Sequence, residues 1–262
     1  MTYVNEKGNR AQQAVSHTEE MEKIYGNEIK KAIQDTIIYD VDYACTRDCG
    51  NDDEESRRIT LEPLDSVSAI MKAAVDGSRM AVLNFASYRN PGGGFIVGSK
   101  AQEECLCHES FLYNVLSEMK EFYDWNNQHK NRTLYRNRAL YTPGVIFVRG
   151  KKQVSCDVIT CAAPNFSAAY KYQNISHKEN SEVLRNRIRF VLDIARENQV
   201  NTLILGAFGC GVFGQDPREV ASIFKEYLET DYKWCFEKVI FAIPKGKDGN
   251  CQAFAEVWDF DV

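Results

Sequence analysis

The chain has 262 residues, of which 44% are hydrophobic and 26% charged, and this composition excludes the disordered and fibrous classes. Its formal net charge of −5 excludes the broad basic surface with which proteins neutralise the phosphates of duplex nucleic acid, so no general nucleic-acid binding is expected. An anionic ligand would therefore have to be held by a few local groups.

Targeting signals and cysteine usage indicate the compartment. The first ten residues, MTYVNEKGNR, lack the apolar segment of a signal peptide, and no run approaches the roughly 18 apolar residues of a membrane span. Most of the nine cysteines lie in apolar runs such as VITCAAP, and their number is odd. This favours buried reduced thiols over a disulfide framework. We expect a cytoplasmic protein without membrane contact.

Helical and strand-like patterns alternate along the chain. Residues 9–35 are polar and rich in Glu and Lys with spaced apolar side chains, which predicts a helix packed on the surface of the core. Apolar runs at 36–39 and 59–64 predict strands on either side of an acidic loop at 48–55. Further helices are expected at 66–76, 99–120, 182–198, 217–229 and 250–258, and further strands at 80–86, 145–148, 154–163, 202–207 and 239–243.

This alternation predicts an α/β fold. Near-continuous apolar strands separated by helices are typical of a sheet that is buried on both faces, hence of a three-layer α/β/α sandwich. Functional residues are then expected on loops at the carboxyl ends of the strands. We expect residues 1–35 to form a helical extension and residues 36–262 to form one domain.

The segment 83–110, LNFASYRNPGGGFIVGSKAQEECLCHES, is the most informative. It leaves a strand, passes three glycines, and enters a helix for which Ser99 and Gln102 form a capping box. Glu103 and Glu104 then face the mouth of the glycine loop. First-turn acids commonly just complement the helix dipole. Adjacent helical side chains also diverge by about 100°, so the two acids cannot flank a bond from opposite faces. One would act, and the other would orient the substrate.

A second glycine loop lies in the segment 203–217, LILGAFGCGVFGQDP. Asp216 suits a helix N-cap and Pro217 the first helical position, so the free amides of this loop predict a phosphate site beside a helix N-terminus. The aromatic residues Phe208 and Phe213 either pack in the core or cover a sugar. The loop also reads as G-x-G-x-x-G, which raises a dinucleotide-dependent oxidoreductase as an alternative. That match is weak because the cap follows the last glycine and the next strand ends without an acid.

Two smaller motifs remain open. Pro164 and Asn165 follow a strand and either read a base or ribose or simply form a turn, and the turn is favoured. Cys105, Cys107 and His108 suggest metal binding, but no second Cys/His pair with ligand spacing accompanies them. We therefore expect neither a metal nor a cofactor.

Together these segments resemble the bacterial-type poly(ADP-ribose) glycohydrolases, a branch of the macrodomain superfamily. The signature of that family is three glycines, a spacer of six to eight residues and Gln-Glu-Glu, and here the spacer runs over residues 95–101. The segments LNFASYRNPGGG, LYTPGVIFVRG, VITCAAPN and GAFGCGVFGQDP also match, so the resemblance covers roughly residues 80–260. It implies a macrodomain-like sandwich with a mixed central sheet.

The resemblance also implies roles for single residues. Glu104 would be the general acid and base at the glycosidic oxygen, Glu103 would bind ribose hydroxyls, and Gln102 would hold the loop. Asn90 resembles the ribose-contacting Asn of macrodomains, with Asn84 as a competing candidate, although Ser87 stands where many relatives have Asn. Backbone contacts to the diphosphate and ribose are implied for both glycine loops: Gly92, Gly93 and Gly94 on one side, and Gly209, Cys210, Gly211, Val212, Phe213 and Gly214 on the other.

A carboxyl at a helix N-terminus has its pKa lowered by the dipole, yet a general acid must be protonated near neutral pH. We hypothesise that the negative charges of Glu103 and of the substrate diphosphate raise the pKa of Glu104 once substrate binds. A pH profile of kcat without an acidic limb above pH 5 would contradict this.

Three functions stay open. The first is hydrolysis of ADP-ribose glycosidic linkages, in poly(ADP-ribose) or ADP-ribosyl adducts. The second is a macrodomain-type module that binds ADP-ribose without cleaving it, and the third is an NAD-dependent oxidoreductase. The intact Gln-Glu-Glu favours the enzyme, because a binding module has no need of both acids. Sequence does not specify the group attached to ADP-ribose, endo or exo cleavage, or the oligomeric state.

Overall fold

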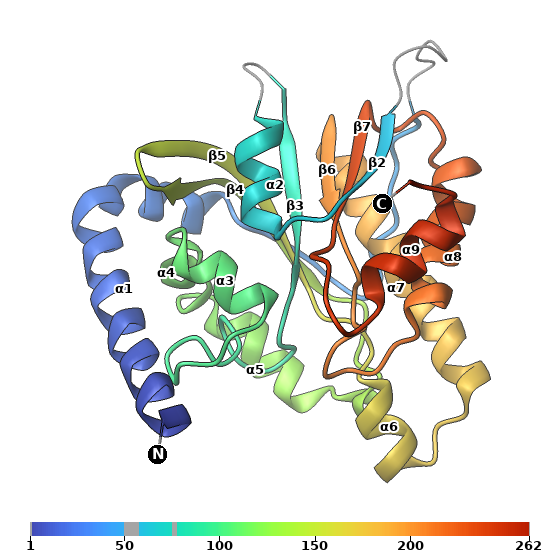
Figure 1. The fold of residues 1–262 in the computed structure, drawn as a ribbon, viewed down its shortest axis with the longest axis horizontal. Coiled ribbons are helices and arrows are strands. Elements are labelled where there is room, and N and C mark those ends of the chain that lie inside the picture. The colour runs from blue at the N-terminus through green and yellow to red at the C-terminus, as the bar shows by residue number, and fades with distance from the viewer. Residues whose placement is uncertain (1, 50–57, 75–77, 262) are drawn as a thin grey trace.

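The computed structural model describes residues 2–49, 58–74 and 78–261 and places all described strands in one mixed sheet of seven strands (Figure 1). The order across the sheet is β1-β4-β5-β3-β6-β7-β2. The strands are β1 (Ile37–Tyr39), β2 (Arg58–Glu62), β3 (Met80–Phe85), β4 (Ala139–Arg149), β5 (Lys152–Cys161), β6 (Thr202–Leu205) and β7 (Lys238–Ala242). The helices are α1 (Thr2–Asp35), α2 (Ser66–Ala73), α3 (Gln102–His108), α4 (Leu112–Leu116), α5 (Lys120–Gln128), α6 (Phe166–Gln173), α7 (His177–Glu197), α8 (Pro217–Glu229) and α9 (Asn250–Trp258), with a short 3-10 turn at Asn131–Thr133.

The five strands β5, β3, β6, β7 and β2 run parallel, whereas β4 lies antiparallel between β1 and β5. Successive side chains of each parallel strand enter opposite layers. In β3, Ala81 and Leu83 pack with α7, α8 and α9, while Met80 and Val82 pack with the helices α1 to α5. The predicted three-layer sandwich with a sheet buried on both faces is therefore confirmed.

The expected helix at 99–120 is wrong, because the chain forms two short helices there, α3 and α4, and begins α5 at Lys120. Its start moves to Gln102: the amide of Ser99 donates to Gly94 O at 2.9 Å, so Ser99 belongs to the glycine loop and Ala101 is the N-cap. The helix breaks again at Ser110, which forms a β-bridge with Phe147, while the amide of Val148 donates to Glu109 O at 2.7 Å. A tertiary contact with β4 thus overrides the helical pattern.

Other boundaries also differ from the prediction. The helix α6 was not predicted, and α7 begins at His177 behind the cap Ser176 rather than at 182. The strand β4 starts at Ala139, six residues before the expected start, because a bulge between Thr142 and Val145 accommodates the Pro-Gly pair that the sequence shows there. The predicted acidic loop at 48–55 and the helix end at 76–77 lie wholly or largely outside the described residues.

The long helix α1 packs along the layer that contains α4 and across β4. Its side chains Met21, Tyr25 and Ile29 are buried there. At its N-terminal end, Arg10 Nε donates to Gly98 O at 2.9 Å, so the helix also contacts the segment that follows the three glycines. No described helix is long and apolar enough to cross a membrane.

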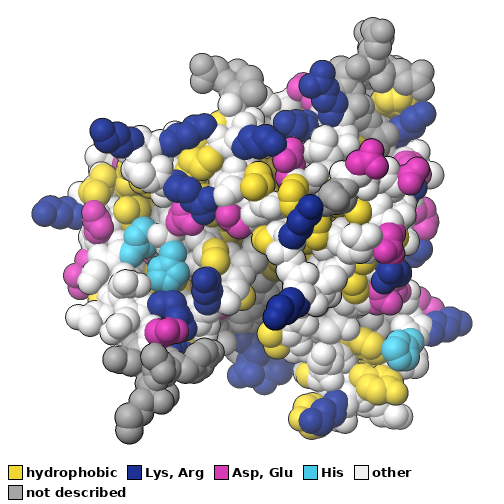
Figure 2. Space-filling view, in the orientation of Figure 1, with side chains coloured by type: hydrophobic (Ala, Val, Ile, Leu, Met, Phe, Trp, Pro, Cys, Tyr) yellow, Lys and Arg dark blue, Asp and Glu magenta, His cyan; other side chains and the backbone are white. Residues whose placement is uncertain are grey.

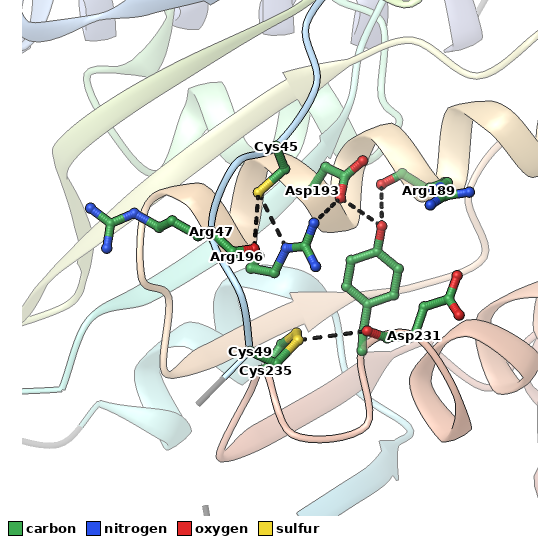
Figure 3. Close-up of a disulfide and its surroundings, with 9 residues drawn as sticks. Cys45, Arg47, Cys49, Arg189, Asp193, Arg196, Asp231 and Cys235 are labelled. Carbon is green, nitrogen blue, oxygen red and sulfur yellow. Dashed lines mark hydrogen bonds and ion pairs between the residues drawn. A yellow bond between two sulfur atoms is a disulfide. The ribbon is translucent and has the colours of Figure 1, made fainter. Parts of the chain in front are cut away.

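A disulfide joins Cys49 to Cys235 (Figure 3), whereas buried reduced thiols were expected in preference to a disulfide framework. The pairing was invisible in the sequence because 186 residues separate the two. It ties the segment after β1 to the turn before β7. The nearby Cys45 is a free thiol whose Sγ lies 3.2 Å from Arg196 Nε. The other six cysteines are also free, and four of the nine are buried.

Candidate active site

A cavity of about 570 Å³ opens at the carboxyl ends of the parallel strands, where functional residues were expected. The chain leaves β3 towards the layer of α3 and leaves the neighbouring β6 towards the layer of α8, so the two connections diverge and open a crevice. In Figure 2 hydrophobic side chains gather in the middle of this face, with Lys and Arg around them. The cavity is lined by Asp65, Ser66, Val67, Phe85, Ala86, Ser87, Tyr88, Arg89, Gly93, Ala101, Gln102, Glu103, Glu104, Cys105, Leu106, Tyr135, Ala163, Ala207, Phe208, Gly209, Gly211, Val212, Phe213, Ala242, Ile243, Pro244, Gly246, Asp248 and Asn250.

Gln102 fixes the start of α3 against the end of β3. Its side-chain oxygen accepts from the amide of Phe85 at 2.9 Å, and its side-chain nitrogen donates to Leu83 O at 2.8 Å and to Ser66 Oγ at 3.1 Å. One side chain thereby continues the hydrogen bonding of a strand and reaches α2. The next two residues are consequently presented at the mouth of the cavity.

Glu103 is 3% exposed, and its carboxyl accepts from the amide of Ser87 at 2.7 Å and from Asn84 Nδ2 at 3.2 Å. Burial raises the pKa of Glu103 to about 8, which outweighs the lowering by these two hydrogen bonds, and the neighbouring Glu104 raises it further. Glu103 is thus largely protonated at neutral pH, whereas we expected from the sequence that it would carry a negative charge.

Both carboxylate oxygens of Glu104 accept backbone hydrogen bonds. The amide of Gly94 donates to Oε1 at 2.8 Å and the amide of Ala101 donates to Oε2 at 2.9 Å. The side chain therefore bridges the glycine loop and the first turn of α3. This capping contact involves Glu104 and Ala101 instead of the predicted Gln102 and Ser99.

Gly93, the middle glycine of the loop, is required for steric reasons. Gly93 has a φ of +63°, and a Cβ added there would lie 2.7 Å from Glu104 Oε1 and 2.8 Å from Glu103 Oε2. Any side chain would displace both carboxyls. The amide of Gly93 donates to Asn90 O at 3.0 Å, and that of Gly94 is taken by Glu104, so these two amides are not directed at a ligand as the family resemblance implied.

In the β6–α8 loop, by contrast, three consecutive amides are free of protein acceptors in the part of the chain that the structure describes. Within the described residues, the amides of Gly211, Val212 and Phe213 donate no hydrogen bond to the protein, and all three residues line the cavity. Consecutive free amides form a concavity that binds anions. The loop ends at Asp216, whose side chain accepts from the amide of Arg218 at 2.8 Å, and Pro217 opens α8 as predicted.

Aromatic rings form the wall next to this loop. Phe213 lines the cavity and meets Tyr135 edge-on at 6.1 Å, and Tyr135 stacks on Tyr88 at 4.2 Å. Phe208 is fully buried in the core and also borders the cavity, whereas Phe213 is partly buried against the core, and a sugar contact of Phe213 stays a prediction. Tyr135 was missed, because nothing in its sequence context marks it. It has a φ of +63°, an uncommon backbone conformation for a non-glycine residue.

Several other predicted contacts lie away from the cavity. Asn90 is exposed on the surface, and Asn84 is buried behind Glu103, where its side chain also donates to Thr160 Oγ1 at 3.3 Å. Asn165 is the N-cap of α6, which agrees with the turn reading. Gly92, Gly94, Cys210, Gly214 and Pro164 support the loops without lining the cavity.

Further lining residues come from the connection between β2 and α2 and from the connection between β7 and α9. Asp65, which was not among the predicted site residues, caps α2 and also faces the cavity. Asn250, at the start of α9, was missed. Asp65 and Asn250 could have been found from their position in the sequence, because each follows the carboxyl end of a parallel strand. In the described part of the chain, no three His, Cys, Asp or Glu side chains come together as metal ligands would.

A mixed sheet with its cavity at this position is the architecture of the macrodomain class, and the macro domain family model matches residues 114–224. The model of the microbial-type PARG catalytic domain matches residues 4–150. The chain belongs to the microbial-type poly(ADP-ribose) glycohydrolase family, and it is a glycosidic-bond hydrolase.

Solved structures agree with this assignment. Poly(ADP-ribose) glycohydrolase from Thermomonospora curvata bound to the inhibitor ADP-HPD is 30% identical, with a TM-score of 0.82 over 95% of this chain and 99% of that chain. The enzyme from Deinococcus radiodurans in complex with ADP-ribose is 31% identical, with a TM-score of 0.78 over 88% of this chain and 97% of that chain. No match was found among curated protein sequences.

The family assignment decides among the three functions left open by the sequence. Hydrolysis of ADP-ribose glycosidic linkages is confirmed as the reaction class. This assignment excludes the two alternatives, the NAD-dependent oxidoreductase and the non-catalytic binding module.

Proposed function

We propose that this chain binds an ADP-ribose unit in the cavity and cleaves the glycosidic bond at its distal ribose, with Glu104 as general acid and base. The observation that carries this proposal is the pairing of two buried carboxyls with three consecutive free amides in one cavity.

The amides of Gly211, Val212 and Phe213 would hold the diphosphate. Arg89 is the only cation among the described lining residues, so neutral amides would contribute most of the anion binding. The distal ribose would then lie against Phe213 and reach the carboxyls. The base would occupy the part of the cavity near Ile243, where apolar side chains offer a surface for stacking.

Cleavage passes through an oxocarbenium-like state, in which the departing oxygen needs a proton and the anomeric carbon then accepts water. Glu104 would donate the proton to the departing oxygen and afterwards accept one from water. Glu103 would hold a ribose hydroxyl. Because burial raises the pKa of Glu103 to about 8, its protonated carboxyl can donate a hydrogen bond to a ribose oxygen near neutral pH.

The test is Glu104→Gln, which keeps the shape but removes the exchangeable proton. Turnover is expected to fall by about 10²- to 10⁴-fold, the usual contribution of general acid–base catalysis, while the Kd for ADP-ribose stays within about threefold. Glu121→Gln, an exposed acid on α5, is the matched control and should retain full activity. Equal turnover of Glu104→Gln and the unchanged protein would refute the assignment.

The attached group is a separate question. Product release should be compared side by side for automodified polymer, a mono-ADP-ribosylated protein and O-acetyl-ADP-ribose. We propose polymer as the preferred substrate. A product pattern dominated by the mono-ADP-ribosylated protein would contradict this preference.

We also propose a cytoplasmic location for the protein. Within the chain, we propose a division between a helical extension at 1–35 and a catalytic domain at 36–262.

A further inference from the structure

Three rings, of which Tyr170 and His177 are exposed and Phe166 is half-buried, form a cluster beside the cavity without lining it. Phe166 and Tyr170 of α6 lie 5.5 Å apart between ring centroids, and His177 at the start of α7 lies 4.8 and 5.4 Å from them. Tyr170 is 59% exposed, and His177 is exposed as well. Figure 2 shows hydrophobic and His side chains on the surface at the lower right, where Figure 1 places α6. We call these three residues the α6 ring cluster.

The α6 ring cluster begins at the aromatic wall of the cavity. The amide of Asn165, the N-cap of α6, donates to Thr133 O at 3.0 Å, two residues before Tyr135, and the amide of Ser167 in the first turn donates to Phe213 O at 3.0 Å. Phe213 and Tyr135 are the rings that line the cavity on that side. The helix therefore starts at the cavity wall and extends over roughly 12 Å, given 1.5 Å per helical residue.

Basic residues predominate on the segment that carries the cluster, and Glu179, the first acid after it, is paired with Arg132. Residues 166–178 contain Lys171 and Lys178 and no acid, although the whole chain has a net charge of −5. Both lysines are exposed, and Lys171 Nζ lies 5.0 Å from the ring centroid of Tyr172, which is 68% exposed. Aromatic rings interleaved with lysines form the surface that stacks bases and neutralises phosphates in single-stranded nucleic-acid binding.

We propose that the α6 ring cluster is a second subsite, which stacks the adenine of the ADP-ribose unit that leaves when the bond is cut. Lys171 and Lys178 neutralise the phosphates of that unit. This inference rests on the proposed function, because the departing unit emerges at the distal ribose, which the proposal places against Phe213. The subsite would favour polymer over an isolated ADP-ribosyl group.

The experiment compares two substrates that share the bond to be cut. One is linear poly(ADP-ribose) of defined length, and the other is ADP-ribose that carries 4-nitrophenol on the distal ribose, whose leaving group is too small to reach α6. For Tyr170→Ala combined with His177→Ala, kcat/KM on polymer should fall at least about fivefold, mainly through KM, because a stacking platform is lost. Hydrolysis of the nitrophenyl substrate should stay unchanged. Tyr170→Phe keeps the ring and should behave like the unchanged protein.

Each other result has a definite meaning. Unchanged polymer kinetics in the double variant would overturn the subsite, and so would an equal loss on both substrates, which would indicate a disturbed cavity. A third result would also overturn the proposal. If the protein binds adenine-rich single-stranded RNA through Tyr170 while the polymer kinetics stay unchanged, the cluster is an RNA-binding site. If the unchanged protein hydrolyses neither substrate, the proposed function itself fails.

Discussion

Glu103 and Glu104 are adjacent in the chain, yet their surroundings differ in kind. Glu103 accepts one backbone and one side-chain hydrogen bond beneath Ser87, whereas both oxygens of Glu104 accept backbone amides from the loop and the helix start. The difference arises because successive helical residues point about 100° apart. One carboxyl therefore points towards the sheet and the other towards the glycine loop.

The raised pKa of Glu103 makes stability depend on pH. Below about 4.5 this carboxyl is protonated in the folded and the unfolded chain, and its contribution to stability is fully present. Between about 4.5 and 8 only the folded chain keeps the proton, so stability is lost as pH rises through this window. Glu103→Gln has no such group, and its free energy of unfolding should fall less between pH 5 and pH 8 than that of the unchanged protein.

Urea denaturation at both pH values measures this difference. The substitution also places an amide opposite the donors of Ser87 and Asn84, which shifts the free energy of unfolding by the same amount at both pH values. Comparing the change between pH 5 and pH 8 within each protein removes this constant shift. Identical pH slopes for the two proteins would show that Glu103 is ionised in the folded state.

Residue types near the cavity were predictable where they belonged to a spaced motif. The glycine loop and the segment Gln102 to Glu104 were recognised because together they form a motif of fixed spacing. Sequence does not show whether Asn90 and Asn84 turn into the cavity, into the core or outward, and a ribose contact for either stays a prediction. Tyr135 was missed because its position depends on an unusual backbone conformation and on stacking against a residue 47 positions away.

Among the elements, α1 contacts the glycine loop that precedes α3 through Gly98. Gly98 has a φ of +76°, and a Cβ there would lie 2.1 Å from the carbonyl oxygen of Lys7. Arg10 also donates to Gly98 O, and His17 of α1 lies against Phe95 of the same loop at 6.4 Å between ring centroids. The helix therefore buttresses the loop that positions Glu104.

Gly98→Ala should reduce both stability and turnover. A left-handed backbone costs a non-glycine residue about 1–2 kcal/mol, and the collision with Lys7 forces the helix and the loop apart at an additional cost of about 1–3 kcal/mol. Gly144→Ala is the matched control, because Gly144 has a φ of +69° with nothing within 4 Å of an added Cβ. It should lower the Tm but leave kcat intact, and equal kcat values in both variants would argue against buttressing by α1.

Element boundaries were less predictable than element types. The strands were recognised because their apolar runs are long, and the caps at Asp65 and Asp216 act as local signals. The helix at 99–120 failed because Ser110 pairs with β4, a contact between residues 37 positions apart. The short helix α6 escaped notice because eight residues with a single buried side chain leave no amphipathic pattern.

At the scale of the whole molecule, the Cys49–Cys235 disulfide closes a loop that contains most of the chain. Such a cross-link restricts the unfolded state and typically contributes about 2–5 kcal/mol. Cys49→Ser should therefore lower the Tm, and a reductant should lower the Tm of the unchanged protein to the same value. Neither change should affect kcat, since neither cysteine lines the cavity.

Cys45→Ser, which removes the neighbouring free thiol, is the control and should leave the reductant effect in place. Thiol titration of the unfolded chain should count seven thiols without reductant and nine with it. A count of nine in both cases would mean that the cross-link does not form.

The divergence of the chain at β3 and β6 has a consequence for how this scaffold changes over time. The crevice exists because two neighbouring strands send their connections to opposite layers, and no particular side chain is needed to open it. The sheet sets where a ligand sits, and the loops set what happens to it. New chemistry can therefore arise by exchange of the connections at the carboxyl ends of the strands, such as 86–104 and 206–216, while the buried strands keep their packing.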